Sequence, residues 1–408
     1  MSRIDQLLNE LAPSGVPLRA LGELGDFVRG NGLQKSDLKE EGFPAIHYGQ
    51  IHTHYGIWAD STKSFTDPVL AAKLRRARPG DLVIATTSED DASVAKATAW
   101  LGSVEAAVSG DAYIYRHSLD PRYIAYFFNS GSFREQKRRH ISGTKVRRIS
   151  GASLAKIQIP VPPVEVQREI VRVLDQFTQL EADLEAELEA RRRQYEYYRG
   201  ALLQFDPTET ASVELSEAFE IRNGYTPAKS DPSNWVNGTV PWFRMEDIRE
   251  NGHVLDRALQ KIPEKAVKGG RCFPAGSLIF ATSATIGEHA LVTVPFLSNQ
   301  RFTAIWPKRS YADRFDMKFL FYFGFVIDEW CRNNTTTSSF ASVDMNGFRR
   351  LRIPMPPLHV QQRIAEQLDH FDALVNDTSI GLPAELAARR KQYEYYRDKL
   401  LTFEEAAA

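Results

Sequence analysis

The sequence predicts an α+β protein with a pseudo-twofold internal repeat, in which two globular domains are separated by two long helical spacers that pair antiparallel, as in a coiled coil. Three observations predict this. The hexapeptide that begins at Gln194 recurs unchanged at Gln392. An Ile-Pro-x-Pro-Pro segment begins at Ile159 and again at Ile353. Strand-like and helix-like patterns are mixed in the stretch before each Ile-Pro-x-Pro-Pro segment.

Each Ile-Pro-x-Pro-Pro segment opens a helical pattern, because proline is tolerated at a helix start and not inside a helix. The first helix is expected over residues 164–204, where apolar side chains recur at every third or fourth position. The second copy is expected to break near Gly381 and Pro383, since both residues oppose a helix interior. At 1.5 Å per residue the first helix is roughly 60 Å long, so its apolar stripe needs a partner, which the second copy supplies. The residues expected to form this helix pairing are Phe177, Leu184, Leu188, Tyr195, Tyr198, Phe371, Leu386, Tyr393 and Tyr396.

A short amphipathic helix is expected at the N-terminus, where Ile4, Leu7 and Leu11 share one face. We expect it to dock near the end of the second spacer, in a ring-like arrangement with pseudo-twofold symmetry. The predicted division of the chain is an N-terminal helix at 1–12, a first domain at 13–158, a central helical spacer at 159–205, a second domain at 206–352 and a C-terminal helical spacer at 353–408.

The two domains combine buried strands with helices. Uninterrupted apolar runs predict strands at 82–85 and 278–281, and aromatic and β-branched residues predict further strands at 113–115 and 302–306. Helical patterns follow at 123–129 and 317–325. Each domain is therefore expected to be α+β.

Composition and charge exclude several classes of protein. Hydrophobic residues are 43% and charged residues 25%, which is typical of a folded soluble protein and too apolar for a disordered one. The net charge of -1 excludes a uniformly basic coat, although local basic patches remain open. Cys272 and Cys331 are the two cysteines, so a disulfide framework and a Cys-rich zinc site are excluded, and a reducing cytoplasm fits best. No run of about 18 apolar residues exists, which predicts no membrane span.

No catalytic signature is found along the chain. It contains no Gly-x-x-x-x-Gly-Lys phosphate loop, no His-Glu-x-x-His and no Asn/Asp-Pro-Pro-aromatic loop of the kind that holds a flipped base. Glu135 and Lys137 have the spacing of some nucleases but lack a suitable acid upstream. His52 and His54 have no cysteine or carboxylate cluster nearby, so surface histidines are favoured over metal ligands. We expect no catalytic residue, no metal and no cofactor.

A dense run of positive charge ends the first domain. Between Arg134 and Arg148 the only acid is Glu135. The seven cations of the run are Arg134, Lys137, Arg138, Arg139, Lys145, Arg147 and Arg148. The second domain has Arg332, a polar run at 333–339 and then Arg349, Arg350 and Arg352. A solvated loop beside a basic helix end would explain one run, but recurrence in both domains favours a track that contacts DNA phosphates.

Polar, turn-rich loops lie earlier in each domain, at 30–36 and 223–230. Gln50 and Arg244 follow these loops, and both side chains can donate hydrogen bonds to base edges in the major groove. The residues expected to contact DNA are Lys35, Gln50, Arg138, Arg139, Thr144, Lys145, Arg147, Arg148, Thr226, Lys229, Arg244, Ser283, Thr336 and Ser338.

Several of these strings resemble a known family. Asn-Gly-Tyr-Thr-Pro at 223–227, Pro-Trp at 241–242 and Ala-Thr-Ser-Ala-Thr-Ile-Gly at 281–287 resemble parts of a target-recognition domain. The Ile-Pro-x-Pro-Pro segments and the repeated hexapeptide resemble the conserved spacers. Along essentially its whole length the chain is similar to the specificity subunits of type I restriction–modification systems. The first domain departs most, because Gly-Asn-Gly-Leu at 30–33 replaces Gly-x-Thr-Pro and no Pro-Trp follows.

The resemblance implies a non-catalytic subunit that binds double-stranded DNA. Each target-recognition domain would read one half of a split target, and the helical spacers would fix the distance between the halves and dock two methyltransferase subunits. Those partners would bind S-adenosylmethionine and modify adenine, and a separate ATP-driven restriction subunit would translocate and cleave DNA.

Other interpretations remain open from the residues themselves. The chain could be a nucleic-acid-binding or protein-scaffolding adaptor outside restriction–modification. Binding to single-stranded DNA or RNA would need aromatic platforms beside the basic run, and 134–148 contains none. A nuclease fused to recognition domains is disfavoured by the missing acid cluster.

Overall fold

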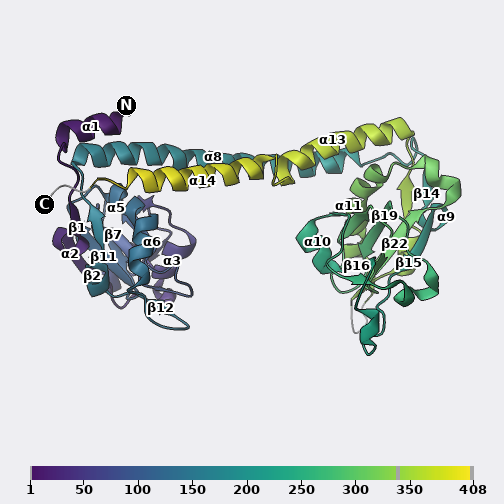
Figure 1. The fold of residues 1–408 in the computed structure, drawn as a ribbon, viewed down its shortest axis with the longest axis horizontal. Helices are drawn as coiled ribbons and strands as arrows, with labels where there is room; N and C mark the ends of the chain where they lie inside the picture. The colour runs from purple at the N-terminus through teal and green to yellow at the C-terminus, as the bar shows by residue number, and fades with distance from the viewer. Residues whose placement is uncertain (1, 337–340, 405–408) are drawn as a thin grey trace. The chain divides into compact units, whose positions relative to one another are not determined.

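In the computed structural model, which describes residues 2–336 and 341–404, the chain forms two compact units. The first unit comprises Met1–Glu185 with Glu385–Ala408, and the second comprises Ala186–Ala384. The long helix α8 (Val164–Leu202) contributes its first part to the first unit and its last part to the second (Figure 1). Among the described residues, no helix combines the length and the apolar character that crossing a membrane requires.

A five-stranded sheet is the centre of the first unit. Its strands, in spatial order, are β2 (Gly25–Arg29), β11 (Ala112–His117), β7 (Leu82–Ala85), β9 (Ala97–Trp100) and β4 (Trp58–Ala59). The first four pair antiparallel, and β4 joins β9 in parallel. All four side chains of β7 are fully buried, which explains why this strand is an uninterrupted apolar run in the sequence.

A second sheet of the first unit follows the loop that comes after β2. Its order is β5 (Ser64–Thr66), β3 (Phe43–Ile46), β10 (Ala106–Val108) and β6 (Arg76–Ala77), and β3 pairs with β10 in parallel. The short helix α3 (Tyr48–Thr53) begins directly after β3.

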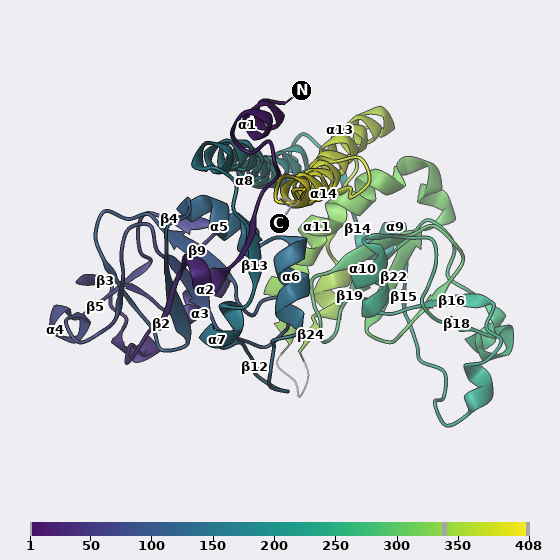
Figure 2. The same cartoon turned by 60° about the vertical axis from the view of Figure 1, so that its left-hand side comes forward.

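Two helices cover the first unit. Figures 1 and 2 show α5 (Pro121–Phe128) between the sheet and α8, and α6 (Gly131–Arg138) follows it. The Asp120 side chain accepts the N–H groups of Arg122 and Tyr123, which caps α5. The shorter elements of this unit are α1 (Arg3–Leu11), β1 (Leu18–Ala20), α2 (Leu21–Leu24), η1 (Lys35–Asp37), α4 (Pro68–Ala71), β8 (Thr87–Ser88), β12 (Arg147–Arg148), α7 (Gly151–Leu154) and β13 (Gln158–Pro160).

The second unit repeats this architecture. Its five-stranded sheet has the order β15 (Phe219–Asn223), β22 (Phe302–Pro307), β19 (Ser277–Ala281), β20 (His289–Val292) and β17 (Val254–Leu255). Again the first four strands pair antiparallel and the last joins in parallel. The predicted strands at 82–85, 113–115, 278–281 and 302–306 are confirmed in the two sheets.

A smaller sheet and one long helix complete the second unit. The sheet is β18 (Lys261–Ile262), β16 (Val240–Phe243) and β21 (Leu297–Ser298), and β16 pairs with β21 in parallel, as β3 does with β10. Helix α11 (Met317–Asn333) takes the place of α5 and α6. The other elements are β14 (Ser212–Glu214), α9 (Leu215–Ala218), η2 (Pro232–Asn234), α10 (Met245–Asn251), η3 (Glu264–Ala266), η4 (Lys268–Gly270), η5 (Arg309–Arg314), β23 (Thr335–Thr336), β24 (Ser342–Val343), α12 (Met345–Arg349) and β25 (Arg352–Pro354).

Stacked aromatic rings pair the helices within each unit. In the first unit, Phe177 of α8 stacks on Tyr396 of α14 (Leu382–Leu400), with ring centroids 5.5 Å apart. In the second unit, Tyr198 of α8 stacks on Phe371 of α13 (Leu358–Asn376) at 5.4 Å. The two stacks exchange the roles of the repeated residues, because Phe177 corresponds to Phe371 and Tyr198 to Tyr396.

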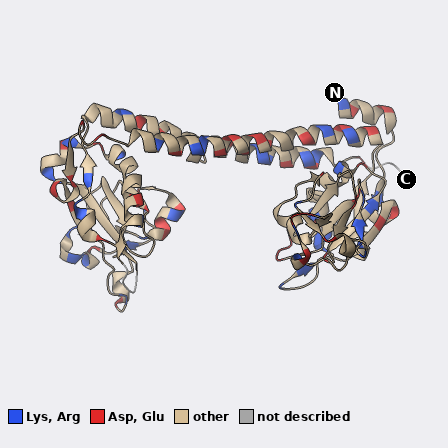
Figure 3. Cartoon of the chain, turned by 180° about the vertical axis from the view of Figure 1, so that it is seen from behind, with Lys and Arg blue, Asp and Glu red and all other residues tan. Residues whose placement is uncertain are grey.

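Charged pairs add to the helix contacts of the first unit. Arg390 of α14 pairs with Glu181 at 2.6 Å and also with Glu185. Because α14 residues of decreasing number meet α8 residues of increasing number, α8 and α14 run antiparallel. Elsewhere on α8, Arg191 pairs with Glu187 along the same helix (3.4 Å). Figure 3 shows Lys, Arg, Asp and Glu interspersed along the helices, as on a solvated helix face.

The predicted break in the second spacer is confirmed. Helix α13 ends at Asn376 and α14 begins at Leu382. A Cβ atom on Gly381 would lie 2.4 Å from the carbonyl oxygen of Ala373. Glycine is therefore required where the chain passes close to the last turn of α13. The first spacer has no such interruption and forms one helix, α8, within two residues of the predicted end.

The N-terminal helix α1 docks where the sequence predicts. Ile4 and Leu7 are buried in the same apolar cluster as Leu401. The N–H of Val16 donates to the carbonyl oxygen of Glu404 at 3.0 Å, so the start of the chain pairs with its C-terminal segment within the first unit. The ring-like arrangement, which concerns the two units together, stays a prediction.

A buried glutamine joins each domain to its spacer. Gln361 of α13 accepts the N–H of Asp316 at 2.9 Å and donates to the carbonyl oxygens of Arg314 (2.9 Å) and Pro356 (2.8 Å). Gln167 of α8 makes the corresponding bond to the N–H of Asp120. Both side chains are buried, so their hydrogen bonds connect the start of α11 or α5 to the spacer without competition from water.

A tyrosine and an aspartate repeat this connection about two turns further along the spacer helix. The hydroxyl of Tyr126 donates to Asp175 at 2.7 Å in the first unit, and Tyr322 donates to Asp369 at 2.7 Å in the second. Burial raises the pKa of both tyrosines, so the hydroxyls stay protonated and keep donating.

One buried polar pair has no counterpart in the first unit. His289 of β20 faces Asp328 of α11, with Nδ1 and Oδ2 2.5 Å apart, and its Nε2 lies 2.8 Å from the carbonyl oxygen of Phe321. A Cβ atom on Gly324 would lie 2.5 Å from this Nε2, so glycine leaves the space that the imidazole fills. By strand register, Ala97 of β9 takes the place of His289.

The glutamine connection leads to a prediction. In Gln361→Ala, two carbonyl groups and one N–H group lose a buried partner, and we expect the second unit to lose about 3 kcal/mol of stability. Hydrogen exchange of the amides in α11 and α13 measures the change. Gln362→Ala, which removes the neighbouring exposed glutamine, is the matched control and is expected to stay within about 0.5 kcal/mol of the unchanged protein. Equal exchange in the two variants would contradict the proposed role of Gln361.

Candidate nucleic-acid interface

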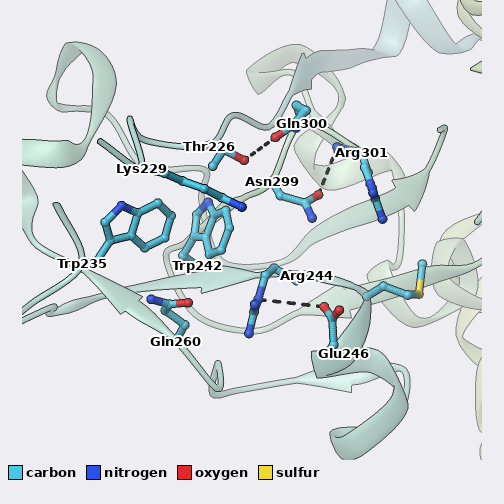
Figure 4. Close-up of a pocket in the computed structure, with 11 residues that line it drawn as sticks. Thr226, Lys229, Trp235, Trp242, Arg244, Glu246, Gln260, Asn299, Gln300 and Arg301 are labelled. Carbon is cyan, nitrogen blue, oxygen red and sulfur yellow. Dashed lines mark hydrogen bonds and ion pairs between the residues drawn. The ribbon is translucent and has the colours of Figure 1, made fainter. Parts of the chain in front are cut away.

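The second unit contains an open hollow between the end of β15, strand β16 and the segment after β21 (Figure 4). Its volume is about 510 Å³. It forms because the chain at Gly224 passes directly over β21, and a Cβ atom there would lie 2.2 Å from the carbonyl oxygen of Asn299. The residues lining it include Thr226, Lys229, Trp235, Trp242, Arg244, Gln260, Asn299, Gln300 and Arg301.

Two tryptophans fix the wall of the hollow. The indole N–H of Trp242 donates to the carbonyl oxygen of Tyr225 at 3.0 Å, and Trp235 packs edge-on against Trp242 with ring centroids 5.1 Å apart. Trp242 is buried, so this residue belongs to the core of the unit and presents only part of its ring to the hollow.

The backbone of Arg244 is held rigidly, and its guanidinium makes long contacts with Trp242 and Glu246. Its N–H donates to Oδ2 of the fully buried Asp247 at 2.7 Å, and Oδ1 of Asp247 accepts the N–H of Leu259 at 2.6 Å. The guanidinium carbon lies 5.6 Å from the centre of the Trp242 ring. Among the described residues, the buried Nε of Arg244 has no hydrogen-bond partner, because the carboxylate of Glu246 is 3.9 Å away.

The rim of the hollow is formed by hydroxyl and amide groups. The Thr226 hydroxyl is hydrogen-bonded to the side chain of Gln300, and Oδ1 of Asn299 accepts the N–H of Arg301 at 3.0 Å. Lys229 is exposed at this rim. The hollow therefore brings together Thr226, Lys229 and Arg244, three residues that the sequence analysis singled out separately.

The first unit has a hollow in the equivalent place, with a volume of about 570 Å³. A Cβ atom on Gly30 would lie 2.2 Å from the carbonyl oxygen of Ser109, so the chain crosses β10 as it crosses β21 at Gly224. Lys35 is exposed at its edge, and Arg29 donates to the carbonyl oxygen of Gly110 at 2.8 Å. The backbone of the hollow is thus repeated with different side chains.

His47, and not Gln50, takes the place of Arg244. Each of His47 and Arg244 precedes the first residue of the helix that follows the inner strand. Oε1 of Gln50 accepts the N–H of His47 at 3.2 Å and Nε2 donates to Ser64 at 2.7 Å, so Gln50 has the capping role of Asp247. Desolvation by burial lowers the pKa of His47, which favours its neutral form.

The basic run of the first unit ends in a tight turn. Ser142 and Arg148 exchange two backbone hydrogen bonds, of 2.9 and 2.8 Å, and β12 pairs with β8. Thr144, Lys145 and Arg148 are exposed on this turn. Arg147 instead pairs with Asp91 at 2.7 Å, which leaves it less available than its neighbours for an external phosphate.

The helical part of the basic run is divided between surface and core. Arg138 and Arg139 are exposed at the end of α6. Lys137 is 4% exposed, and its Nζ donates to the carbonyl oxygens of Ala92 (2.7 Å) and Val94 (2.6 Å). Burial lowers the pKa of Lys137 to about 8. The expectation that the whole run is a surface track is therefore wrong at Lys137, which connects α6 to the loop after β8.

The second unit does not repeat the charge of this turn. There β23 pairs antiparallel with β24, and Thr336 is hydrogen-bonded to the hydroxyl of Ser342 at 2.9 Å. Ser283 forms a β-bridge with Ser342 beside this pairing. The candidate Ser338 lies outside the described residues.

The arginines expected to match the basic run lie elsewhere. Arg332 donates to the carbonyl oxygen of Gly287 at 2.6 Å, and Arg352 donates from Nε to the hydroxyl of Ser212 at 2.9 Å, beside the pairing of β14 with β25. Arg349 is the last residue of α12 and Arg350 follows it. The expectation of equivalent basic tracks is wrong for these positions, because the β14–β25 pairing leads into the spacer and not to the β23–β24 pairing.

Two exposed tyrosines of the spacers were missed by the sequence analysis. Tyr197 is 71% exposed and Tyr395 is 62% exposed, and each ring packs edge-on against the next tyrosine. The apolar stripe does not include these two positions. They could have been found from the repeat itself, because the two copies of the hexapeptide are identical at their exposed positions as well as at their buried ones.

Within the described residues, no group of three or more His, Cys, Asp or Glu side chains is placed to hold a metal ion. Donors and amides outnumber the carboxylates that line the two hollows, Glu246 in the second unit and Asp111 in the first, which suits hydrogen bonding to an acceptor-rich ligand.

Comparison with known families adds to this geometry. The model of the family described as type I restriction modification DNA specificity domain matches residues 13–190 and 207–388. The chain belongs to this family. The two matched ranges reproduce the internal repeat, each with one domain and much of the spacer that follows it.

Members of the type I specificity family are similar to the chain over part of their length. The specificity subunit of type I restriction enzyme EcoprrI from Escherichia coli is 56% identical over 207 residues, which are 49% of this chain and 52% of that subunit. The EcoR124I/EcoR124II specificity subunit from Escherichia coli is 37% identical over 266 residues, 62% of this chain and 65% of that subunit. The chain thus spans between half and two thirds of the length of these curated relatives.

Solved structures show the same fold. A chain solved in a study of complex assembly and conformational transition of the type I R-M system has a TM-score of 0.66 and 18% identity, with 96% of this chain and 98% of that chain covered. The HsdS subunit from Thermoanaerobacter tengcongensis has a TM-score of 0.54 and 17% identity, with 96% and 97% covered. The predicted α+β fold with two domains and helical spacers is confirmed.

The crossing at Gly224 leads to a prediction. In Gly224→Ala the new Cβ atom must displace the backbone at Ser298 and Asn299, and we expect a cost of about 2 kcal/mol, which lowers the melting temperature by about 5 °C. The control is Gly200→Ala in α8, where a Cβ atom meets nothing within 4 Å and alanine favours the helix. If the two variants melt together, the crossing does not need glycine.

Proposed function

We propose that the chain is the DNA-reading specificity subunit of a type I restriction–modification complex and recognises a two-part duplex target. Residues 13–158 and 206–352 are the target-recognition domains in this proposal, and 159–205 and 353–408 are the spacers. The observation that carries it is the pair of equivalent hollows, because one backbone frame presents Arg244 in the second domain and His47 in the first.

Two domains that share one backbone arrangement but carry different side chains are suited to recognise two different short DNA sequences. Direct readout needs donors and acceptors fixed at a groove edge, and phosphate contacts hold the reader in register. The exposed cations Lys35, Arg138, Arg139, Lys145, Arg148 and Lys229 are the proposed phosphate contacts, and Thr144, Thr226, Ser283, Thr336 and Ser338 the proposed polar contacts. Arg147 and Gln50 support these surfaces through Asp91 and Ser64.

The partners follow from the family and from the repeated surface. Tyr197 and Tyr395 present an exposed ring on the same hexapeptide in two spacers whose preceding domains differ. A surface repeated unchanged on the spacers of divergent domains fits a second copy of one partner better than two different partners. We propose that each copy docks one methyltransferase subunit, and that restriction subunits join through them, so that bond chemistry belongs to the partners.

Selection from a random duplex library tests this function. The chain is purified together with its methyltransferase subunits, and the expected result is enrichment of two short sequences separated by a fixed gap. Assembly with methyltransferase but no sequence enrichment would leave a scaffolding role and overturn the proposal.

The basic turn leads to a prediction about salt. In the double variant Lys145→Ala with Arg148→Ala, we expect the slope of log affinity against log salt to fall by up to about 2, since each lost phosphate contact removes about one released counterion. The control is Arg191→Ala with Arg193→Ala, which removes two cations of α8 that already pair with Glu187 and Glu189. A slope that is the same in both variants counts against phosphate contacts at the turn.

The repeated tyrosines lead to a prediction about stoichiometry. Tyr197→Ala or Tyr395→Ala is expected to weaken binding of one methyltransferase copy, and the double variant that of both, as counted by native mass spectrometry. Burying one such ring contributes about 2 kcal/mol, or roughly 30-fold in affinity. Glu196→Ala with Glu394→Ala changes the neighbouring exposed positions about 100° around the helix and serves as the control. Unchanged assembly in the tyrosine double variant would remove this docking surface.

A further inference from the structure

We propose that Arg244 is a specificity-determining residue that reads a guanine in the half of the target bound by the second domain. This inference rests on the proposed function, and it goes further because it names one residue, one base and one half of the target.

The position of Arg244 is set before any ligand binds. Its backbone N–H is fixed by the buried Asp247, and the guanidinium lies over the ring of Trp242, which is itself held by the carbonyl oxygen of Tyr225. Arginine has a planar fork of donors, and a fork whose base is fixed loses little conformational freedom when it binds. The geometry is therefore suited to reading and not only to attracting charge.

One donor of the fork, Nε, has no hydrogen-bond acceptor among the described residues. This atom is buried, and the nearest carboxylate, that of Glu246, is too far away at 3.9 Å. An unpaired buried donor costs free energy that a ligand acceptor can recover. A ligand with acceptors matched to a fork would supply the missing partner.

Guanine supplies such a pair of acceptors. Its O6 and N7 lie on one major-groove edge, whereas adenine offers one acceptor beside a donor, thymine one acceptor beside a methyl group, and cytosine a donor. The rim side chains Gln260 and Asn299 carry amide groups that can meet the neighbouring base edges.

A DNA phosphate is the other ligand that would fit a fork, and Lys229 and Arg301, which also line the hollow, would attract one. At the fork of Arg244 itself, the neighbouring carboxylate of Glu246 favours guanine. The carboxylate of Glu246 is exposed and lies 3.9 Å from Nε of Arg244. Figure 4 shows the two side chains facing each other. An anionic phosphate at the fork would be repelled by this carboxylate, whereas the uncharged edge of guanine would not.

The first domain cannot make the same contact. Nδ1 of His47 accepts the N–H of Gly49 at 3.2 Å, so its proton lies on Nε2, and the lowered pKa keeps the ring neutral. A single N–H cannot satisfy both O6 and N7 of a guanine. The contact proposed for Arg244 therefore has no equivalent at His47.

The test uses the complex of the full chain with its methyltransferase subunits. Library selection with the unchanged chain should yield a target with at least one guanine in one half. Selection with Arg244→Ala should leave one guanine position undefined in that half and the other half unchanged. Arg249→Ala, which removes an exposed cation of the neighbouring helix α10, should give the original target.

A base analogue separates base from phosphate. Replacing the guanine by 7-deazaguanine removes the N7 acceptor, and we expect about 10-fold weaker binding by the unchanged chain. For Arg244→Ala and Arg244→Lys, guanine and 7-deazaguanine should bind within about twofold of each other. Arg244→Lys keeps a positive charge and controls for charge alone.

Three results would overturn the inference. One is a target without guanine in either half. Another is an Arg244→Ala variant that keeps the full target but loses affinity equally on all duplexes with a smaller salt slope, which would assign Arg244 to a phosphate. The third is that Arg244→Ala and His47 variants alter the same half of the target, which would contradict the assignment of the two residues to different halves. Absence of any selected target with the unchanged chain would instead mark failure of the proposed function itself.

Discussion

The burial of the apolar stripe of α8 is the constraint on which the rest of the structure depends. A helix of 39 residues is stable in water only where its apolar face is covered, and no single domain of this chain covers it. Phe177 stacks on Tyr396 of α14 in the first unit and Tyr198 stacks on Phe371 of α13 in the second, so one helix packs against a partner helix in each unit. The buried Gln167 and Gln361 then join each domain to its spacer helix, so that the position of each domain on its spacer depends on buried contacts and not on a loop.

Much of this fold could be predicted because its signals are local. The spacing of apolar residues predicted the end of α8 to within two residues. Gly381 and Pro383 predicted the break between α13 and α14. Burial of charged residues is not a local property, and there the prediction failed. Lys137 belongs to a basic run in the sequence but turns inward to two carbonyl groups, and Arg352 belongs to the spacer pairing.

The candidate site was partly predictable for the same reason. Thr226, Lys229 and Arg244 could be picked by residue type, but that they share one hollow depends on the crossing of Gly224 over β21, which is a long-range contact. Gln50 was paired with Arg244 because both side chains can donate. The structure shows that the capping role, shared by Gln50 and Asp247, is what the two positions have in common, and that His47 is the true counterpart.

The buried contact of His289 with Asp328 has a consequence for how the second unit can change over time. Nε2 of His289 faces a carbonyl oxygen and must carry a hydrogen, so the contact of Nδ1 with the carboxyl group requires one further hydrogen, held by either partner. Replacing His289 alone would leave a buried carboxyl group without its partner, beside the space left by Gly324. Replacing Asp328 alone would leave the buried imidazole without its partner. The two positions are thus expected to covary, and to be exchanged together for apolar residues such as Ala97, which takes the place of His289 in the first unit.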